Sequence, residues 1–375
     1  MSDRDAASRE PRPVVTVAIH PGHADSMLTP GDLGRLSEFA AVRTAYLEGP
    51  VGVIDDLAPN PAAEAALAEI ATGSTALVVT HGSPRVTAAV LDALPTVTFV
   101  GELEGDRFCT RIDTAAAAER GVVVVDTTHG SSLPVAEWAL ALAILGLRDA
   151  GRFVRALMNH ELVGSGGHGD PGRLTNRELT GKRVGLIGFG HIGWRLVELL
   201  RPFEAEAIAF DPYAPRELAD AAGISFARLD TVMSSCDLVC CLAPLTPGTR
   251  GLITGSLLSS MRPGSVFVNV SRGAVVDRAG LNEVAALGEH VFCLDVLEDE
   301  PIPVSQVLRD LPNVLLTPHI AGTTQESRFR FFSLMVDELR RHLHGLEPHA
   351  QITADTVAGR RGRDVPDSYR RVAKP

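Results

Sequence analysis

Residues 181–193 read GKRVGLIGFGHIG, and this stretch decides the fold that the chain is expected to adopt. Residues 184–187 are typical of a short buried strand, and the apolar pattern after the stretch favours a helix. Between them Gly188, Gly190 and Gly193 form G-x-G-x-x-G, which allows a tight turn, close approach of a pyrophosphate and packing of helix on strand. The helix N-terminus would offer N–H groups to that anion. Glycine-rich turns also occur for purely steric reasons, so other residues must decide between the two interpretations.

A carboxylate follows the glycine turn at the distance that a dinucleotide site needs. Residues 207–210 resemble a second strand, and Asp211 ends it eighteen residues beyond Gly193. In dinucleotide-binding folds an acid about 20 residues after the turn binds the ribose hydroxyls. The same carboxylate would repel a 2′-phosphate, which favours NAD over NADP. Turn and acid together predict a Rossmann domain that binds NAD.

The composition is that of an ordinary globular protein. The 375 residues are 45% hydrophobic and 22% charged, and they suffice for two domains. A net charge of −11 argues against a nucleic-acid-binding protein, which needs a basic face. The first thirteen residues do not resemble a signal peptide, and the apolar run 135–147 contains Glu137 and is too short for a bilayer. We expect a cytoplasmic protein without nucleic-acid or membrane partners, in which 135–147 is a buried helix.

The cysteines and histidines show no metal-binding pattern, and we expect no metal site. His20 and His23 would suit a metal only with a carboxylate or thiol near them in sequence, so 20–23 is expected to be a polar loop. No cysteines have C-x-x-C spacing and several lie in or beside apolar runs, which predicts buried free thiols in a reducing compartment. They are Cys109, Cys236, Cys240, Cys241 and Cys293.

Strands and helices alternate along the chain, which predicts parallel sheets whose ligands gather at the carboxyl ends of the strands. The first series of expected strands covers residues 14–19, 76–80, 97–100 and 122–126. The second covers 184–187, 207–210, 238–242, 266–270, 291–294 and 314–316. Expected helices cover 61–70, 86–94, 135–148, 194–200 and 326–343, with a polar surface loop at 159–180 and a loose tail from residue 357.

Three residues after the later strands can carry chemistry. Arg272 offers a planar fork that can hold a carboxylate, and His319 is a natural proton acceptor for an alcohol under oxidation. Glu300 beside that histidine would orient its ring and favour its protonated form. Each residue alone has an ordinary structural explanation as a turn, a cap or a surface acid. Together, in a domain with a dinucleotide turn, they predict hydride transfer between a nicotinamide and a 2-hydroxy acid; Asp295 would contact the nicotinamide side or cap its own loop.

Beyond these single residues, the chain resembles the D-isomer-specific 2-hydroxyacid dehydrogenases over nearly its whole ordered length. The matching blocks are GKRVGLIGFGHIG, FDPYA, APLTPGTRGLI, MRPGSVFVNVSRGAVVD, CLDVLEDEP and LPNVLLTPHIAGTT, in that order. The resemblance implies that Arg272 binds the substrate carboxylate and carbonyl, and that Glu300 pairs with His319, the general acid/base. It implies substrate contacts at His81, Gly82 and Ser83. It further implies cofactor contacts at Gly188, Gly190, His191, Ile192, Gly193, Asp211, Ala243, Pro244, Val270, Ser271, Asp295, Ala321 and Gly322.

The resemblance also implies the architecture. The expected fold is α/β, with an NAD-binding Rossmann domain inserted into a smaller flavodoxin-like α/β substrate domain. Residues 1–132 form the first part of the substrate domain, 133–321 the Rossmann domain, and 322–375 the return helix and tail. A cleft between the domains would close by hinge motion, and the helix at 135–148 would contribute to a homodimer.

The predicted function is hydride transfer between NAD(H) and C2 of a D-2-hydroxy acid or 2-oxo acid, of the glyoxylate/hydroxypyruvate or phosphoglycerate type. The stretch 101–109 and the loop before the Rossmann domain depart from the family pattern, so the sequence does not identify the substrate. Alternatives are phosphite oxidation and a corepressor-like NAD(H) sensor with little turnover. Formate dehydrogenases resemble a version with Gln where Glu300 stands, so they fit poorly.

Overall fold

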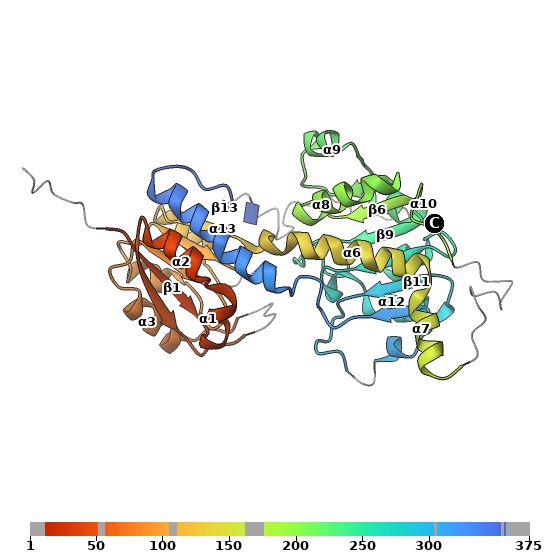
Figure 1. Cartoon of the computed structure of the whole chain (residues 1–375), viewed down its shortest axis with the longest axis horizontal. Coiled ribbons are helices and arrows are strands. Elements are labelled where there is room, and N and C mark those ends of the chain that lie inside the picture. The colour runs from red at the N-terminus through yellow and green to blue at the C-terminus, as the bar shows by residue number, and fades with distance from the viewer. Residues whose placement is uncertain are drawn as a thin grey trace, which may run out of the picture. The chain divides into compact units, whose positions relative to one another are not determined.

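The computed structural model describes residues 12–51, 57–104, 111–161, 176–303, 306–353 and 356–357. Within these residues the chain divides into two compact units (Figure 1). Unit 1 contains the residues up to Ser131 together with Gln325–Val357, and unit 2 contains Ser132–Thr324. Unit 2 is therefore inserted between two parts of unit 1 along the chain.

Unit 1 is a six-stranded sheet with helices on both faces. The strand order is β13-β5-β4-β3-β1-β2, and every pair is parallel except β13 with β5. The first five strands thus have the flavodoxin-like order 2-1-3-4-5. Helices α3, α4 and α5 bury apolar residues against one face, and α1, α2 and α13 against the other. The strands are β1 (Val14–Ile19), β2 (Ala41–Tyr46), β3 (Ala76–Val79), β4 (Phe99–Glu102), β5 (Val123–Asp126) and β13 (Gln351–Ile352); the helices are α1 (Pro21–Met27), α2 (Pro30–Ser37), α3 (Pro61–Ile70), α4 (Ala88–Asp92), α5 (Thr114–Glu119) and α13 (Gln325–Leu343).

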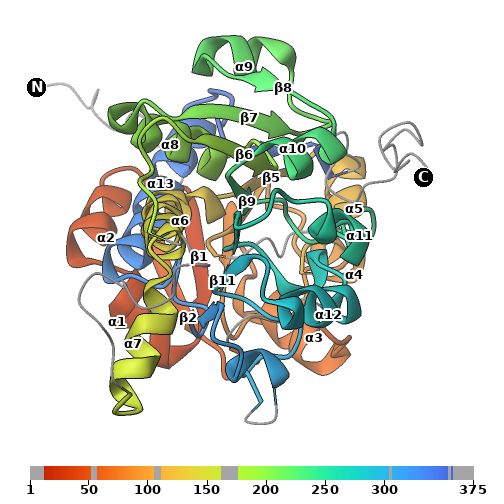
Figure 2. The ribbon, with the colours of Figure 1, turned by 90° about the vertical axis from the view of Figure 1, so that its right-hand side faces the viewer.

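Unit 2 is a seven-stranded parallel sheet in the order β12-β11-β10-β9-β6-β7-β8. This is the Rossmann order with one further strand, and the direction of winding reverses between β6 and β9 (Figure 2). Helices α6, α8 and α9 cover one face and α10, α11 and α12 the other. The strands are β6 (Arg183–Ile187), β7 (Glu206–Phe210), β8 (Ser225–Phe226), β9 (Leu238–Cys241), β10 (Val266–Asn269), β11 (Val291–Leu294) and β12 (Val314–Leu316); the helices are α6 (Ser132–Leu147), α7 (Ala150–Met158), α8 (His191–Leu200), α9 (Arg216–Ala222), α10 (Leu229–Ser235), α11 (Gly255–Ser259) and α12 (Arg278–Leu287).

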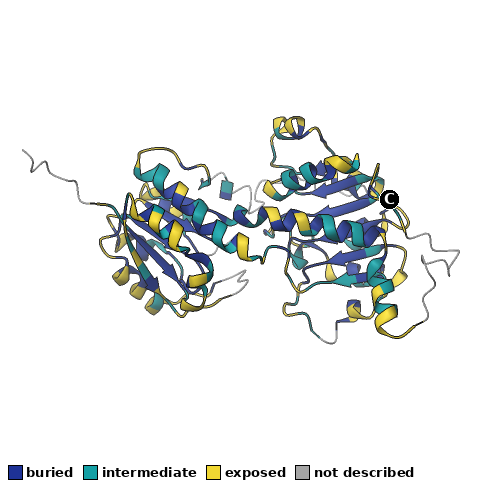
Figure 3. Cartoon of the chain, viewed as in Figure 1, coloured by how far each residue is buried: buried dark blue, intermediate teal, exposed yellow. Residues whose placement is uncertain are grey.

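The central strands of both sheets are fully buried, while the outward faces of the covering helices are exposed (Figure 3). Strands β9 and β10 are buried at every position. A parallel sheet covered on both faces needs such continuous apolar strands, which explains why runs of Val, Leu and Cys form these elements.

Helix α6 is the apolar helix expected at 135–147, and it packs on the sheet of unit 2. Gly146 lies so close to β10 that a Cβ there would stand 2.5 Å from a methyl carbon of Val266. Helical structure begins earlier than the apolar run, so the stretch Thr128–Leu147 reaches 20 residues. Among the described residues it is the single helix long and apolar enough to cross a membrane, and half of its most apolar part is buried inside the protein. These contacts identify it as a core helix.

Most expected elements are present with shifted ends, and one expected loop is the start of a helix instead. Residues 20–23 were expected to be a polar loop, but His20 is the N-cap of α1 and accepts a hydrogen bond from the backbone N–H of Gly22. Several elements had no expected counterpart, among them the edge strand β2 and the helix α7, which has no buried residue. The expected loop at 159–180 lies partly, and the tail from 358 onward wholly, outside the described residues.

The four described cysteines are free and buried, as predicted: Cys236, Cys240, Cys241 and Cys293. Burial raises the pKa of the Cys236 thiol to about 11 and that of Cys293 to about 12. These thiols are therefore protonated and inert at neutral pH. Cys109 lies outside the described residues.

Candidate active site

The glycine turn lies between β6 and α8, at the point where the winding of the sheet reverses. Gly188 has φ +94°, and a Cβ there would stand 2.8 Å from the backbone nitrogen of Ala243, so only glycine fits. A Cβ on Gly193 would meet the Phe189 ring at 2.9 Å. A Cβ on Gly190, by contrast, would meet no atom within 4 Å. The open side at Gly190, just before the N-terminus of α8, fits a pyrophosphate. Gly188 and Gly193 are instead required by close contacts within the protein.

Asp211 follows β7 and links the next loop to the glycine turn. One carboxylate oxygen accepts the backbone N–H of Phe189 at 2.7 Å. The other accepts the N–H groups of Tyr213 and Ala214 at 2.9 and 3.0 Å. The acid therefore stands beside the turn, where the ribose of a dinucleotide would lie, and it also holds the backbone of the site.

The loops after β9 and β10 meet at Ser271. The hydroxyl of Ser271 lies 3.3 Å from Sγ of Cys241 and donates to Oδ1 of Asn269 at 3.1 Å. Nδ2 of Asn269 donates to the carbonyl of Arg272 at 3.2 Å. Asn269 thus fixes the turn that presents Arg272, a role that the sequence analysis missed although the residue opens the N-x-x-R-G pattern. Ala243, Val270 and Ser271 are buried, while Pro244 is exposed.

Asp295 follows β11 and caps the loop after β12. Its buried carboxylate accepts the hydroxyl of Thr317 and the backbone N–H groups of Ile320 and Ala321, the latter two at 3.1 and 2.9 Å. The carbonyl of Asp295 accepts the N–H of His319 at 2.8 Å. Asp295 therefore caps the loop after β12 rather than its own loop; its contact with the nicotinamide side of the cofactor stays a prediction.

His319 is held in an unusual backbone conformation next to Glu300. Its φ is +53°, a region that non-glycine residues seldom occupy and that is enriched at functional sites. Nδ1 of His319 lies 2.7 Å from Oε2 of Glu300, and both side chains are about one quarter exposed. The glutamate fixes the ring through Nδ1, which leaves Nε2 as the nitrogen that can exchange a proton with a ligand.

The loop of Arg272 lies directly against the loop that leads to Glu300. A Cβ on Gly273 would stand 1.9 Å from the carbonyl carbon of Leu297, so the two backbones touch. Arg272 donates through Nη1 to the carbonyl of Ser271 at 2.8 Å. Arg272, Asp295 and His319 follow the adjacent strands β10, β11 and β12, at one edge of the sheet.

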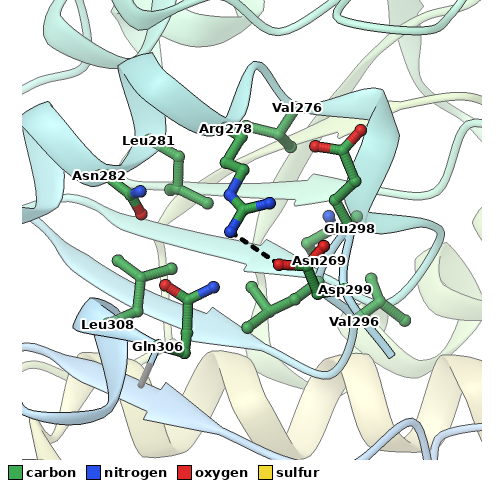
Figure 4. Close-up of a pocket in the computed structure, with 12 residues that line it drawn as sticks. Asn269, Val276, Arg278, Leu281, Asn282, Val296, Glu298, Asp299, Gln306 and Leu308 are labelled. Atoms are coloured by element: carbon green, nitrogen blue, oxygen red, sulfur yellow. Dashed lines mark ion pairs between the residues drawn. The ribbon is translucent and has the colours of Figure 1, made fainter. Parts of the chain in front are cut away.

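Behind these loops is a cavity of about 20 Å³, which has room for one water molecule. Figure 4 shows the side chains that surround it, including the ion pair of Arg278 with Asp299 at 2.7 Å. Its wall includes Asn269 and Glu298, from the loops of the site. The cavity is too small for a substrate, so it belongs to the support of the loops.

His81, Gly82 and Ser83 follow β3 in unit 1. His81 lies at the sheet edge with Nε2 2.7 Å from Oε2 of Glu104. The hydroxyl of Ser83 is buried and donates to the carbonyl of Ala18 at 2.8 Å, so this side chain anchors the loop to β1. Arg111, also buried, donates to the Ser83 carbonyl and pairs with Glu102. The part of the 101–109 stretch beyond Glu104 lies outside the described residues.

Within the described residues, no group of three or more His, Cys, Asp or Glu side chains has the arrangement of a metal site. The polar side chains that follow the strands instead form hydrogen bonds with the backbone and with one another. With the open side of Gly190 and the acid at the end of β7, unit 2 fits a dinucleotide.

Comparison with known proteins agrees with this geometry. Residues 140–321 match the family model described as "D-isomer specific 2-hydroxyacid dehydrogenase, NAD binding domain". Over 275 residues the chain is 33% identical to (S)-sulfolactate dehydrogenase of Chromohalobacter salexigens, covering 72% of this chain and 85% of that protein. Over 270 residues it is 30% identical to D-3-phosphoglycerate dehydrogenase of Archaeoglobus fulgidus, covering 72% of this chain and 50% of that protein. The chain thus spans about half the length of this relative.

A solved structure shows the same likeness in three dimensions. The NADPH-dependent glyoxylate/hydroxypyruvate reductase of Sinorhizobium meliloti, in complex with citrate, matches with a TM-score of 0.67 at 26% identity, over 92% of this chain and 99% of that one. Sheet order, glycine turn and family match define an α/β protein with an NAD-binding domain. The chain belongs to the D-isomer-specific 2-hydroxyacid dehydrogenase family.

Proposed function

We propose that this protein is an NAD-dependent dehydrogenase that transfers a hydride between NAD(H) and C2 of a D-2-hydroxy acid or the corresponding 2-oxo acid. The observation that carries the proposal is the His319–Glu300 pair, on a loop that Asp295 caps, in the domain that contains the glycine turn. Unit 2 serves as the cofactor domain and unit 1 as the substrate domain. Relatives named for phosphoglycerate, hydroxypyruvate and sulfolactate support a small 2-hydroxy or 2-oxo acid as substrate.

The catalytic roles follow from the chemistry of three side chains. Arg272 binds the substrate carboxylate through its guanidinium fork. Nε2 of His319 takes the hydroxyl proton in oxidation and returns it in reduction, while Glu300 orients the ring and stabilises the imidazolium. Bound NAD supplies or accepts the hydride. Asn269 and Asp295 are positioning residues, because they act through the loops of Arg272 and His319.

The cofactor binds along the carboxyl edge of the sheet in unit 2. The glycine turn and the start of α8 bind the pyrophosphate, Asp211 binds the adenosine ribose, and the loops after β9, β10 and β12 line the nicotinamide half. The proposed contacts are Gly188, Gly190, His191, Ile192, Gly193, Asp211, Ala243, Pro244, Val270, Ser271, Ala321 and Gly322. In unit 1, His81 and Gly82 are proposed substrate contacts, and Ser83 holds their loop.

The proposal includes a homodimer in the cytoplasm. Val154, Leu157 and Met158 on α7 are 59%, 60% and 76% exposed, and α7 has no buried residue. Such an apolar helix face beside α6 is typical of a surface that a second copy covers. The free thiols of unit 2 suit a reducing compartment.

A panel of 2-oxo acids tests the function. The protein is mixed with NADH and glyoxylate, pyruvate, hydroxypyruvate, phosphohydroxypyruvate or a branched or aromatic 2-oxo acid, and NADH absorbance is followed; phosphite with NAD is the arm for the alternative reaction. Turnover with at least one 2-oxo acid is expected. Tight NADH binding without turnover of any compound would instead support an NAD(H) sensor, and turnover of phosphite alone would support a phosphite dehydrogenase.

A further inference from the structure

A chain of hydrogen bonds within unit 2 connects helix α6 with the loop after β12. Nε1 of Trp138, in the second turn of α6, donates to the hydroxyl oxygen of Thr317 at 3.4 Å. The Thr317 hydroxyl in turn donates to Oδ1 of Asp295. The Asp295 carboxylate accepts the backbone N–H groups of Ile320 and Ala321. The chain therefore begins on a helix that packs on the sheet and ends in the backbone of the loop.

The direction of each hydrogen bond in this chain is fixed by the groups that form it. An indole N–H can only donate and an ionised carboxylate can only accept, whereas a hydroxyl group does both. Thr317 must therefore accept from Trp138 and donate to Asp295, which gives its hydroxyl one orientation. Hydrogen bonds in series polarise one another, and a bond to a carboxylate is stronger than a bond between neutral groups. Donation from the indole thus strengthens the bond between Thr317 and Asp295.

Helix α6 is a fixed support for the indole ring. Its residues Ala136, Ala139, Leu142 and Ala143 are at most 1% exposed and belong to the core of unit 2. Trp138 is half-buried and packs against the same core. A tryptophan ring combines a large apolar body with a single N–H that needs a partner when it is buried. The core therefore holds the ring, and the ring N–H reaches the loop.

The loop after β12 needs support because of the backbone conformation of His319. The φ of +53° at this residue is sparsely populated, and such conformations persist only where surrounding contacts hold them. Asp295 holds the loop from the end of β11. Thr317, two residues before His319, is the point at which α6 adds a second contact.

We propose that Trp138 is a positioning residue that holds, through Thr317, the loop on which His319 exchanges its proton. This role rests on the proposed function, which assigns the proton to His319. Trp138 lies outside residues 140–321, which match the family model, so that match assigns it no part in the site. The proposal adds α6 to the elements that support the reaction.

Three substitutions test the chain of hydrogen bonds. Trp138→Phe removes the N–H and keeps an aromatic ring, so kcat with a 2-oxo acid is expected to fall at least ~3-fold, the lower end for one neutral hydrogen bond. Thr317→Val removes the hydroxyl at nearly the same shape and should lower kcat at least ~10-fold, because a bond to a charged group is lost. Thr317→Ser keeps the hydroxyl and should restore near-native kcat. In all three variants KM and NADH affinity should change little, since neither side chain binds a ligand.

The combination of two substitutions distinguishes positioning from a purely structural role. In the Thr317→Val protein, adding Trp138→Phe should have no further effect on kcat, because the indole then has no hydroxyl through which to act on Asp295. If Trp138 only packs against the core, the substitution lowers kcat by the same factor in both backgrounds. Equal factors would therefore overturn the proposal.

The second tryptophan of the chain provides the matched control. Nε1 of Trp194 donates to Oε1 of Glu198 at 3.2 Å, within α8. Trp194→Phe removes the same chemical group from the same unit without changing the loop after β12, so kcat should stay unchanged. Thermal melting of each variant shows that it is folded. An equal fall of kcat in Trp194→Phe and Trp138→Phe would contradict the proposal.

Backbone amide exchange separates this proposal from the proposed function, because it needs no turnover. In Trp138→Phe the amides of Ile320 and Ala321 should exchange at least ~3-fold faster, since their acceptor is held less firmly, while the amides of α8 keep their rates. If the native protein turns over no 2-oxo acid, the proposed function fails, and faster exchange in this loop still supports its link with α6. Unchanged exchange at both amides in folded Trp138→Phe would overturn the proposal, whether or not the native protein is active.

Discussion

Asp211 combines two tasks that are usually considered separately. In the proposed function its charge discriminates against a 2′-phosphate, and in the structure its two oxygens accept three backbone N–H groups that shape the turn and the next loop. Substituting this residue therefore changes both cofactor choice and local structure. Asparagine loses the charge but keeps one of the two acceptor oxygens, so it should disturb the backbone less than alanine does.

For Asp211 we expect Asp211→Asn to raise the affinity for NADPH relative to NADH at least ~10-fold and to lower the melting temperature less than Asp211→Ala does, because one of the two acceptor oxygens is kept. Asp211→Ala should relax the same preference and also lower stability by about 1–3 kcal/mol, because it leaves backbone donors without their acceptor. Fluorescence titration with both nucleotides and thermal melting provide the measurements. A preference for NADH that survives in both variants would remove Asp211 from cofactor selection.

At the scale of single elements, Asp295 caps the loop after β12, so its removal should lower both the stability of the protein and the rate of catalysis. In Asp295→Ala we expect a loss of about 2–4 kcal/mol in the free energy of unfolding, because a buried carboxylate with three donors is removed. The kcat should also fall, since Thr317, Ile320 and Ala321 lose the contacts that hold the loop in which His319 has its positive φ. Denaturant titration and steady-state kinetics measure the two effects. Glu206→Gln is the control, because it breaks only an exposed pair with Arg183 at the amino end of β7; equal losses in both variants would contradict the capping role.

In the turn between β6 and α8, Gly193 is required by packing within the protein, whereas Gly190 faces the open side where the ligand is proposed to bind. Gly190→Ala adds a methyl group to open space, so the melting temperature should change little while the affinity for NADH falls at least ~10-fold. Gly193→Ala places a methyl group against the Phe189 ring and should destabilise the protein by about 1–3 kcal/mol. Melting curves with and without NADH test both variants. Undiminished NADH affinity in Gly190→Ala would show that the anion does not bind there.

Much of the element pattern follows from local sequence. The buried strands of unit 2 are continuous apolar runs, and Arg272 and His319 come directly after two of them, so their place at one sheet edge is predictable. Strand β2 was missed because it is an edge strand with alternating polar residues, and α7 because it has no buried face. The pair of His81 with Glu104 depends on the pairing of β3 with β4, which local patterns do not contain. Asn269 was visible in its motif, but its bond to the Arg272 carbonyl needed the structure.

At the scale of the whole molecule, buried histidines make stability depend on pH. Burial lowers the pKa of His290, which is 3% exposed, and of His342, below the ordinary value near ~6.5. The unfolded chain therefore binds more protons than the folded one below that value, so stability is complete above about pH 6.5 and falls as the pH decreases toward the folded-state pKa values. Each such histidine contributes at most about 1.4 kcal/mol per pH unit.

For His290→Gln we therefore expect a smaller loss of stability between pH 7.5 and 5.5 than in the native protein. Denaturant titrations at both pH values measure the difference. A native protein that is equally stable at both, or a variant that loses more stability than the native protein on acidification, would contradict the account.

In the proposed function His319 exchanges the proton in a reaction whose hydride passes to or from NAD(H). The most direct test is the rate of NADH oxidation with a 2-oxo acid substrate by the native protein and by His319→Asn, measured alongside NADH affinity. We expect that the native protein oxidises NADH, that kcat falls at least ~10²-fold in the variant, and that the affinity for NADH changes less than about twofold. A variant that keeps near-native turnover, or a native protein that binds NADH and oxidises none of it, would contradict the claim.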